Sequence, residues 1–335
     1  MINIFKLIKN KLKENKKYRV KPHTVIIDIS NRCNASCPFC SRQLSEVKRN
    51  NLMSKEMFYE IMAEVKKIKK VKNICFAAWG EPMLHPNFDE FANFVIDQGY
   101  KLSFPTNMSL ADKHFDTLLK VDTVMMSIEG HDKESYEKKR LNLNFEKTYA
   151  NIVKFNELIE EHKKENKSTP KRVINYLVSK NSHVDDFMNL WRPLCDEMRV
   201  GPILPLILWN NEKNNTELTC RNDIKPELIP CNDFVKDMFC SQVFNIIVIR
   251  ANGNLALCCS DYDIDLDFGT YKNLYKTFKT NKNLNKIRQE FRNKKLNICK
   301  NCFQNYEVKK EHLFSFLPEL EKYDNQNDIK IYTNR

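Results

Sequence analysis

Short apolar segments alternate with longer amphipathic ones along the first 205 residues. Segments rich in β-branched and aromatic residues predict strands at residues 24–30, 73–78, 101–104, 122–127, 172–178 and 197–204. Between them, apolar residues at helical spacing predict helices over residues 54–70, 87–98, 110–120, 144–163 and 183–191. This alternation is typical of β–α units on a parallel sheet. Because six units are too few for the closed eight-stranded barrel, we expect an α/β fold built as an open, partial barrel.

A different pattern begins near residue 205. Residues 206–235 are rich in Asn and Pro and predict a linker, and 243-VFNIIVIRANGNLALCC-259 predicts a β-hairpin turning at Asn252-Gly253. A helix is expected over residues 274–293. The chain is therefore expected to have five parts, which are an N-terminal segment 1–22, a core 23–205, the linker 206–235, a small second domain 236–305 and a tail 306–335.

The positive charge is concentrated near the N-terminus. The formal net charge is +12, and residues 1–22 hold eight Lys and Arg against Glu14 alone. Apolar residues recur there at helical spacing, namely Ile2, Phe5, Ile8 and Leu12. The segment predicts a basic amphipathic helix, which either packs on the domain or contacts an anionic membrane surface or acidic partner through residues 1–17. Because it has few aromatic side chains for stacking on bases, no specific nucleic-acid partner is expected.

The sequence predicts neither a membrane span nor a signal peptide. No stretch reaches the roughly eighteen apolar residues that a span needs, and lysines interrupt the apolar residues of the N-terminus. We therefore expect a cytoplasmic protein, with membrane association only through residues 1–17. In a reducing compartment the twelve cysteines are not expected to form a disulfide framework, and clustered cysteines are more often metal ligands.

Three cysteines crowd into the loop after the first predicted strand. The segment 31-NRCNASCPFCSR-42 carries Cys33, Cys37 and Cys40. Zinc sites usually consist of two separated ligand pairs, whereas three thiolates in one loop suit a [4Fe–4S] cluster. Three thiolates leave one iron without a protein ligand, and a substrate or cofactor can bind there. The alternative is a structural zinc with a remote fourth ligand.

The CxxxCxxC spacing after a first strand resembles that of the radical S-adenosylmethionine (SAM) superfamily. Three other segments, each after a predicted strand, resemble that family's landmarks in the same order. The segment 76-FAAWGEPMLHP-86 resembles the family's Gly-Gly-Glu-Pro segment, 105-PTN-107 resembles its Thr-Asn, and 127-SIEG-130 resembles its Ser-x-Asp-Gly. Trp79 stands where the family has the first glycine, which leaves the local backbone geometry open. The resemblance covers about residues 20–205 and implies a partial (β/α)6 barrel of the radical SAM type.

The resemblance also implies a set of SAM contacts, which are Phe39, Gly80, Glu81, Thr106, Asn107, Ser127, Glu129 and Asn181. Phe39 would pack on the adenine. Gly80 and Glu81 would receive the amino group, because a carboxylate pairs with an ammonium by charge-assisted hydrogen bonds. Ser127 and Glu129 would face the ribose, although Glu129 replaces the family's Asp. Asn181 would lie near the cofactor.

The chemistry implied by the resemblance depends on the open iron. In the family, SAM binds that iron through its amino and carboxylate groups, and one electron splits the sulfonium into methionine and a 5′-deoxyadenosyl radical. The radical abstracts hydrogen from unreactive C–H bonds, while the protein orients the reactants and excludes water. The implied partners are a small-molecule substrate and an electron donor such as a flavodoxin or ferredoxin.

A second set of cysteines lies in the expected second domain. The spacing from Cys240 through Gly253 to Cys258, followed by 299-CKNC-302, resembles the SPASM and twitch auxiliary-cluster domains. The implied ligands of a second, auxiliary [4Fe–4S] cluster are Cys240, Cys258, Cys299 and Cys302. Four thiolates close a cluster completely, so this one would transfer electrons rather than bind substrate. Cys259 is an alternative to Cys258 as the cluster ligand, and the glycine spacing favours Cys258. A structural zinc ribbon is the alternative to a second cluster.

Asp261 and Gly269 also match the layout of these domains. Asp261 alternatively caps a turn.

Oxidation of a small molecule is the leading functional hypothesis. The cysteine layout resembles the twitch-domain alcohol dehydrogenase of aminoglycoside biosynthesis, so the resemblance implies a dehydrogenase-like radical SAM oxidoreductase with a sugar or cyclitol-like substrate. The sequence identifies no general base.

Three alternatives stay open. One is a peptide- or protein-modifying SPASM maturase, which often carries an N-terminal leader-binding domain, whereas only about 22 residues precede the first strand here. Another is a radical epimerase using Cys220 or Cys231 to return hydrogen. The third is a non-catalytic, metal-dependent binding module. Cys75 and Cys195 are expected in the core.

Overall fold

A computed structural model gives the fold of the chain. The structure describes residues 19–44, 50–77, 79–203, 233–234, 240–262, 266–293, 306–307 and 310–332. Several sequence predictions fall outside these residues. They are the N-terminal helix within residues 1–17, nearly all of the linker 206–235, and Cys220, Cys231, Cys299 and Cys302.

Eleven strands are present in the described part of the chain. They are β1 (Thr24–Ile27), β2 (Asn73–Cys75), β3 (Lys101–Thr106), β4 (Thr123–Ser127), β5 (Lys171–Val178), β6 (Glu197–Pro202), β7 (Asp233–Phe234), β8 (Ile246–Ile249), β9 (Leu255–Ala256), β10 (Tyr306–Glu307) and β11 (Ile329–Ile331). All six strands predicted in the core are confirmed, several with shorter bounds.

The described α-helices are α2 (Ser41–Leu44), α3 (Lys55–Lys66), α4 (Phe88–Asp97), α5 (Phe115–Leu118), α6 (Lys133–Lys139), α7 (Phe145–Lys164), α8 (Val184–Trp191), α9 (Gln242–Asn245), α10 (Leu274–Thr280), α11 (Lys282–Arg292) and α12 (Lys310–Phe316). The described 3-10 helices are η1 (Pro82–Leu84), η2 (Ala111–Lys113), η3 (Arg192–Leu194) and η6 (Pro318–Tyr323).

Two predicted helices differ from those in the structure. The helix expected over residues 110–120 is η2 followed by α5, because His114 leaves helical geometry between them. The helix expected over residues 274–293 is α10 and α11. Asn281 separates them in an extended conformation, and its side chain accepts a hydrogen bond from the Leu284 amide (3.0 Å), which starts α11.

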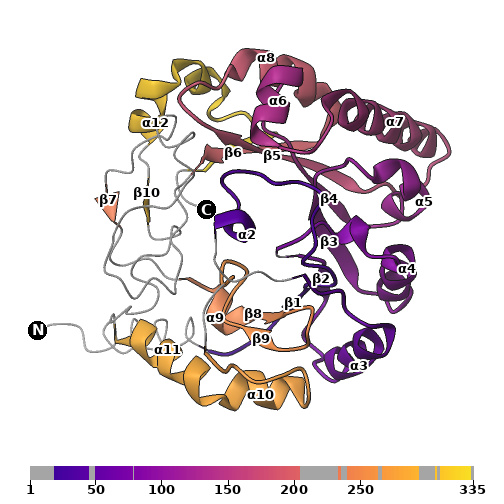
Figure 1. Ribbon diagram of the computed structural model, residues 1–335, viewed down its shortest axis with the longest axis vertical. Coiled ribbons are helices and arrows are strands. Elements are labelled where there is room, and N and C mark those ends of the chain that lie inside the picture. Colours follow the sequence, from indigo (N-terminus) through magenta and orange to yellow (C-terminus); the bar gives the residue numbers. More distant parts are fainter. Residues whose placement is uncertain are drawn as a thin grey trace, which may run out of the picture.

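One nine-stranded sheet organises the molecule. Its strand order is β11-β6-β5-β4-β3-β2-β1-β8-β9, and every neighbouring pair is parallel except β8 with β9. Figure 1 shows the sheet curving as an arc, with α3, α4, α5, α7 and α8 along its outer side. The predicted α/β partial barrel is therefore confirmed. Its carboxyl edge, where parallel sheets usually bind ligands, carries the loops that contain the motifs.

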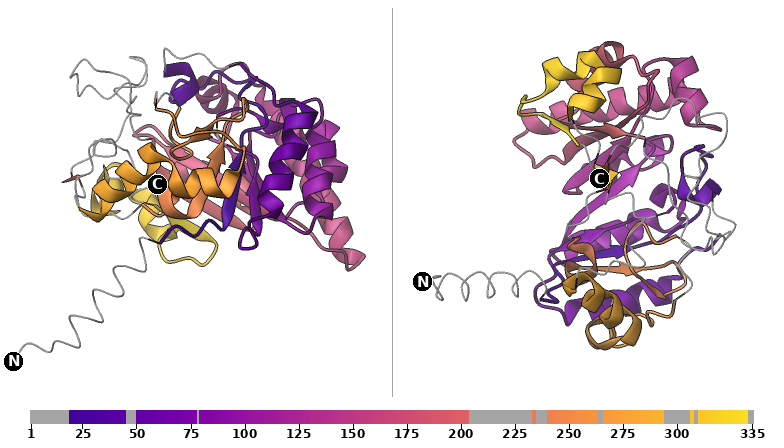
Figure 2. Two further views of the ribbon diagram at one scale, coloured as in Figure 1. Left: turned by 90° about the horizontal axis from the view of Figure 1, so that it is seen from below. Right: turned by 90° about the vertical axis from the view of Figure 1, so that its left-hand side faces the viewer.

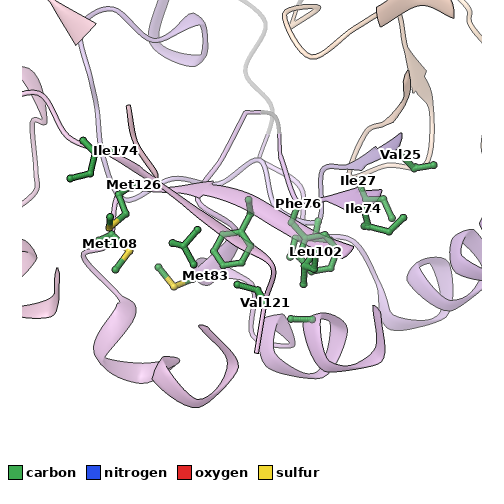
Figure 3. Packing of buried hydrophobic residues seen from close by; sticks show 14 of the residues in the cluster. Val25, Ile27, Ile74, Phe76, Met83, Leu102, Met108, Val121, Met126 and Ile174 are labelled. Carbon is green, nitrogen blue, oxygen red and sulfur yellow. The ribbon is translucent and has the colours of Figure 1, made fainter. Parts of the chain in front are cut away.

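The main core lies between the sheet and its outer helices. Alternate residues of each strand point outward, such as Val25 and Ile27 on β1, and they pack with Phe76 and Leu102 (Figure 3). These four side chains have essentially no exposed surface. The residues that alternate with them along each strand point to the opposite, concave face of the sheet, called the concave wall below.

The predicted hairpin is present, and it belongs to the same sheet. β8 and β9 pair antiparallel across a turn in which the Arg250 amide donates to the Asn254 carbonyl (2.8 Å). Gly253 has a φ of 84°, as a glycine turn allows. β8 also pairs in parallel with β1 over the whole strand, from Thr24 with Ile246 to Ile27 with Ile249. The hairpin therefore extends the barrel sheet beyond β1.

Later parts of the chain cover both ends of the sheet. α10 packs against α3 at one end, while β11 pairs with β6 and η6 lies against α8 at the other (Figure 2). The expected tail 306–335 thus contributes a helix and an edge strand. None of the helices in the described part of the chain is long and apolar enough to cross a membrane.

Candidate functional site

The cysteine loop leads directly from the carboxyl end of β1. Cys37 is buried, Cys33 and Cys40 are partly buried, and the Cys40 amide donates to the Cys37 carbonyl (3.1 Å). The Ala35 amide donates to the Cys33 sulfur (3.4 Å). Burial, and then the nearby Glu81 carboxylate, raise the pKa of the Cys33 thiol to about 12, and the other two thiols add to this effect. The structure therefore brings the three sulfurs into one electrostatically coupled group.

Gly80 lies against the start of the cysteine loop. A Cβ atom at Gly80 would lie 2.0 Å from the Ser30 carbonyl oxygen and 2.5 Å from that of Arg32. The adjacent Glu81 amide donates to the Arg32 carbonyl (2.8 Å). Only a residue without a side chain permits this approach of two backbones, so Gly80 fixes the distance between the second loop and the cysteine loop.

Replacing Gly80 by alanine should therefore destabilise the protein. We expect G80A to lower the free energy of unfolding by about 1–3 kcal/mol, the usual cost of overpacking, in urea denaturation followed by tryptophan fluorescence. G201A is the matched control, since the nearest atom to its new Cβ would be 3.4 Å away in ordinary contact. Equal losses in the two variants would contradict the close approach at Gly80.

Glu81 is the centre of a buried hydrogen-bond network. Its carboxylate accepts from the Thr106 hydroxyl (2.9 Å), the Asn107 amide (2.8 Å) and the Met83 amide (3.3 Å). The Asn107 side chain then donates to the Asn34 side chain (2.9 Å) in the cysteine loop. The loops after β1, β2 and β3 are thereby tied together, as the order of the motifs predicts.

Burial also changes the acidity of Glu81. Loss of solvent raises the pKa of this carboxyl to about 7, against the opposing effect of its three hydrogen bonds. An ammonium group placed beside it would favour the ionised form. Binding of a cationic ligand beside Glu81 should therefore strengthen as the pH rises through about 7, where the carboxyl ionises.

Arg140 connects the cysteine loop with the loop after β4, and the sequence analysis missed it. Its guanidinium forms a two-point ion pair with Glu129, one bond of which is 2.7 Å, and donates to the Cys37 sulfur (3.3 Å). Its carbon Cζ lies 5.7 Å from the centre of the Phe39 ring. Burial opposes the charge on Arg140, yet Cys37 and Glu129 raise its pKa well above the ordinary value.

Arg140 was missed because α6 was not predicted. The signal was present, since Asp132 accepts from the Ser135 amide (2.8 Å) and starts α6 as an N-terminal cap. Arg140 follows directly after this helix.

The remaining predicted SAM contacts differ in their surroundings. Ser127 ends β4 and is half-buried, and Glu129 is 1% exposed and held by Arg140. Asn181 lies in the turn after β5 with an exposed side chain. The predicted residues in the loops after β1, β2 and β3 therefore lie close to Glu129. Asn181 forms no part of their hydrogen-bond network as far as the described residues show.

The donor set of the cysteine loop fits an iron–sulfur cluster. It offers three thiols, an amide N–H directed at one sulfur and a guanidinium directed at another. Among the described residues, no three His, Cys, Asp or Glu side chains are arranged to hold a single metal ion. In a cluster each cysteine binds a different iron atom, so its ligands need not converge on one point. Cys33, Cys37 and Cys40 would hold the cluster.

The second set of cysteines lies beside the hairpin. Burial raises the pKa of the Cys240 thiol and Cys259 adds to this effect, while the backbone N–H groups of Gln242 and Val243 oppose it. Cys258 is buried in the turn after β9. The glycine spacing predicts Cys258 as the cluster ligand, and Cys259 is the alternative. Cys75 packs on the same small apolar cluster as Cys259, and Cys195 packs on the main core.

Two family profiles match the chain. That of the radical SAM superfamily matches residues 27–188, and that of the SPASM iron–sulfur cluster-binding domain matches residues 240–303. The chain belongs to the radical SAM superfamily and carries a SPASM domain. Its cofactors are accordingly a SAM-binding [4Fe–4S] cluster, SAM and an auxiliary iron–sulfur cluster.

Two curated proteins share part of the sequence. The chain is 32% identical over 106 residues to the tungsten-containing aldehyde ferredoxin oxidoreductase cofactor-modifying protein of Pyrococcus furiosus, a match that covers 31% of this chain and 30% of that protein. It is 34% identical over 88 residues to the S-adenosylmethionine-dependent nucleotide dehydratase of Selenomonas ruminantium, covering 26% and 31%. The chain thus spans about a third of the length of the curated relatives it matches.

Two solved structures share the fold over most of the chain. SuiB of Streptococcus suis bound to its precursor peptide SuiA has a TM-score of 0.61 at 16% identity, covering 86% of this chain and 72% of SuiB. The structure of anSMEcpe with bound AdoMet has a TM-score of 0.56 at 18% identity, covering 91% and 100%. At these identities the likeness shows the fold alone.

Proposed function

We propose that the chain is a SAM-dependent dehydrogenase that oxidises a small polar molecule, such as a sugar or cyclitol-like alcohol. The observation that carries the proposal is the position of the hairpin. β8 pairs with β1, the strand that leads into the cysteine loop, and the centre of the Tyr262 ring, in the turn after β9, lies 6.2 Å from that of the Trp79 ring. An auxiliary cluster bound at Cys240 and the turn after β9 would lie beside the barrel sheet, which supports its proposed role as the acceptor of the substrate's electron.

The proposed reaction balances as a two-electron oxidation. SAM bound at a cluster held by Cys33, Cys37 and Cys40 would supply a 5′-deoxyadenosyl radical, which would take one hydrogen atom from the carbinol C–H bond of the substrate. The hydroxyl proton would leave to a base or to water, and the remaining electron would pass to the auxiliary cluster. The alcohol would become a ketone, and the auxiliary cluster would be reduced by one electron.

The residues proposed to hold SAM are those predicted from sequence, which are Phe39, Gly80, Glu81, Thr106, Asn107, Ser127, Glu129 and Asn181. Burial of Glu81 and its raised pKa support its pairing with the SAM ammonium. Thr106 and Asn107 hold the Glu81 carboxylate in place through their hydrogen bonds. Proposed ligands of the auxiliary cluster are Cys240, Cys258 or Cys259, Cys299 and Cys302.

The polar residues on the concave wall of the sheet support the proposal of a small polar substrate. Along β4, β5 and β6, outward-pointing residues such as Val124 and Ile174 are fully buried. The residues that alternate with them include Ser127, Asn175 and Arg199, which are only partly buried. A wall with accessible hydroxyl, amide and guanidinium groups suits a ligand rich in hydrogen-bonding groups. The two curated relatives are named as a cofactor-modifying protein and a nucleotide dehydratase, which also supports a small-molecule substrate.

Deuterium transfer tests the proposal. The anaerobically reconstituted protein is incubated with SAM, a reductant and a panel of alcohols that carry deuterium at the carbinol carbon. We expect one alcohol to transfer deuterium into 5′-deoxyadenosine and to yield a ketone with reduction of the auxiliary cluster. Deuterium transfer from a peptide, with none from the alcohols, would identify a maturase instead. An epimer that gains hydrogen from solvent would identify an epimerase, and loss of that product in C220A or C231A would name its thiol.

Two partners complete the proposal. A flavodoxin- or ferredoxin-type protein would supply the electron for SAM cleavage. Residues 1–17 would contact an anionic membrane surface from the cytoplasmic side, because their excess of lysines favours such lipids. Equal co-sedimentation of the whole chain and of residues 18–335 with phosphatidylserine vesicles would contradict this membrane contact.

A further inference from the structure

Trp79 joins the SAM-binding segment to the auxiliary domain. It occupies the position of the family's first glycine, directly before Gly80, and its side chain is only 5% exposed. It packs in a small apolar cluster on the concave wall with residues of β1, β8, β9 and the turn that follows, which are Ile26, Val248, Ala256 and Tyr262. Its indole N–H, although buried, has no hydrogen-bond partner among the described residues. The ring is therefore held by apolar packing, by an edge-to-face contact with Tyr262 and by the cation–π contact with Arg250.

Arg250 connects Trp79 with the turn after β9, which carries Cys258 and Cys259. Its guanidinium carbon lies 4.8 Å from the centre of the Trp79 ring, a cation–π contact. The same group binds the Asp261 carboxylate (2.8 Å), and both side chains are almost fully buried, with exposures of 6% and 0%. A third contact runs to the Tyr262 carbonyl (3.2 Å). A buried, paired guanidinium with this many partners is held in one geometry.

Asp261 in turn closes the turn that carries Cys258 and Cys259. Its carboxylate accepts the Leu257 amide (2.7 Å) before the two cysteines, and its own amide donates to the Cys258 carbonyl (3.2 Å). Asp261 therefore caps the turn, as the sequence allowed, and it also anchors the turn to Arg250. A continuous series of contacts runs from Gly80 through Trp79, Arg250 and Asp261 to the cysteine turn.

We propose that Trp79, Arg250 and Asp261 couple SAM binding to the redox state of the auxiliary cluster. In this scheme a ligand bound against Gly80 and Glu81 restrains the adjacent Trp79 ring, and the ring in turn restrains the Arg250 charge beside the turn that carries Cys258 and Cys259. Charges and hydrogen bonds around a cluster set its reduction potential. Coupling of this kind is reciprocal, so reduction of the auxiliary cluster changes the affinity for SAM by the same factor. Trp79 is a positioning residue in this scheme, and the scheme is independent of which substrate is oxidised.

A redox titration with and without SAM tests the coupling. In anaerobically reconstituted protein, EPR spectra that resolve the two clusters give the midpoint potential of the auxiliary cluster. We expect SAM to shift this potential by at least ~40 mV, which corresponds to about a fivefold change in SAM affinity at 59 mV per tenfold. In W79L the shift should fall below ~20 mV, about twofold, because the ring that contacts Arg250 is gone. In W79F, which keeps an aromatic ring, an intermediate shift is expected.

R250K and R172K form a matched pair of variants. Lysine keeps the charge of Arg250 but cannot reproduce its planar stacking and forked hydrogen bonds, so R250K should lose the SAM-dependent shift. Arg172 pairs with Asp196 (2.6 Å) at the start of β5, away from both cysteine sets, and R172K should retain the shift. Three results would each overturn the inference: the absence of a shift in the unaltered protein, a full shift in W79L and R250K, or an equal loss in R172K.

Discussion

Replacing Cys37 by serine should remove the SAM cluster and leave the auxiliary cluster in place. Cys37 is 5% exposed, lies in the three-thiol group and receives a hydrogen bond from Arg140. A serine hydroxyl is a poor ligand for iron, because iron–sulfur clusters are held by thiolates. Iron content in the reconstituted protein should fall from about eight to about four atoms per chain. Formation of 5′-deoxyadenosine should fall by at least ~10³-fold, which removes more than about 4 kcal/mol of catalysis.

C195S is the matched control for this variant. Cys195 packs on the main core, and its sulfur contacts the Arg192 carbonyl (3.6 Å). C195S should keep its iron and its activity, measured by iron analysis and by chromatography of the SAM products. Full iron content and SAM cleavage in C37S would mean that the three-cysteine loop is not the cluster site.

Replacing Arg140 by methionine should cause the largest loss of stability. Glu129 is 1% exposed, and its carboxylate is paired with Arg140, itself 11% exposed. Removal of one partner leaves a buried charge uncompensated, which costs about 3–5 kcal/mol. R140M should therefore unfold at markedly lower urea concentration. The double variant E129Q/R140M should recover part of the loss, because the amide carries no charge.

The Arg192–Asp328 pair is the matched control for the Arg140 variant. It has the same two-point geometry, with bonds of 2.8 and 2.9 Å, but its side chains are 37% and 40% exposed. Surface pairs of this kind contribute about 0–1 kcal/mol. R192M should therefore change the free energy of unfolding by no more than that. Equal losses in R140M and R192M would contradict the argument from burial.

Much of the fold and of the first site follows from local sequence patterns. The six core strands were predicted because each is a short β-branched segment bounded by turn residues. The loops that carry Cys33, Glu81 and Thr106 meet because parallel strands place their carboxyl ends at one edge of a sheet. In the structure the Thr106 hydroxyl donates a hydrogen bond to the Glu81 carboxylate.

Features that depend on contacts between distant segments could not be predicted in the same way. The pairing of β1 with β8 joins residues 24–27 to residues 246–249, and no local pattern specifies that register. The ion pair of Arg140 with Glu129 depends on α6, whose seven residues lack a clear apolar repeat. The contacts of Trp79 depend on the same long-range pairing, since its neighbours come from β8, β9 and the turn that follows.

Reductive cleavage of SAM by the unaltered protein tests the central claim most directly. The chain is reconstituted anaerobically with iron and sulfide, supplied with SAM and dithionite, and its products are measured by chromatography and mass spectrometry. The account predicts equal amounts of 5′-deoxyadenosine and methionine from the unaltered protein and none from C37S. Absence of 5′-deoxyadenosine from protein that holds its iron and binds SAM would contradict it.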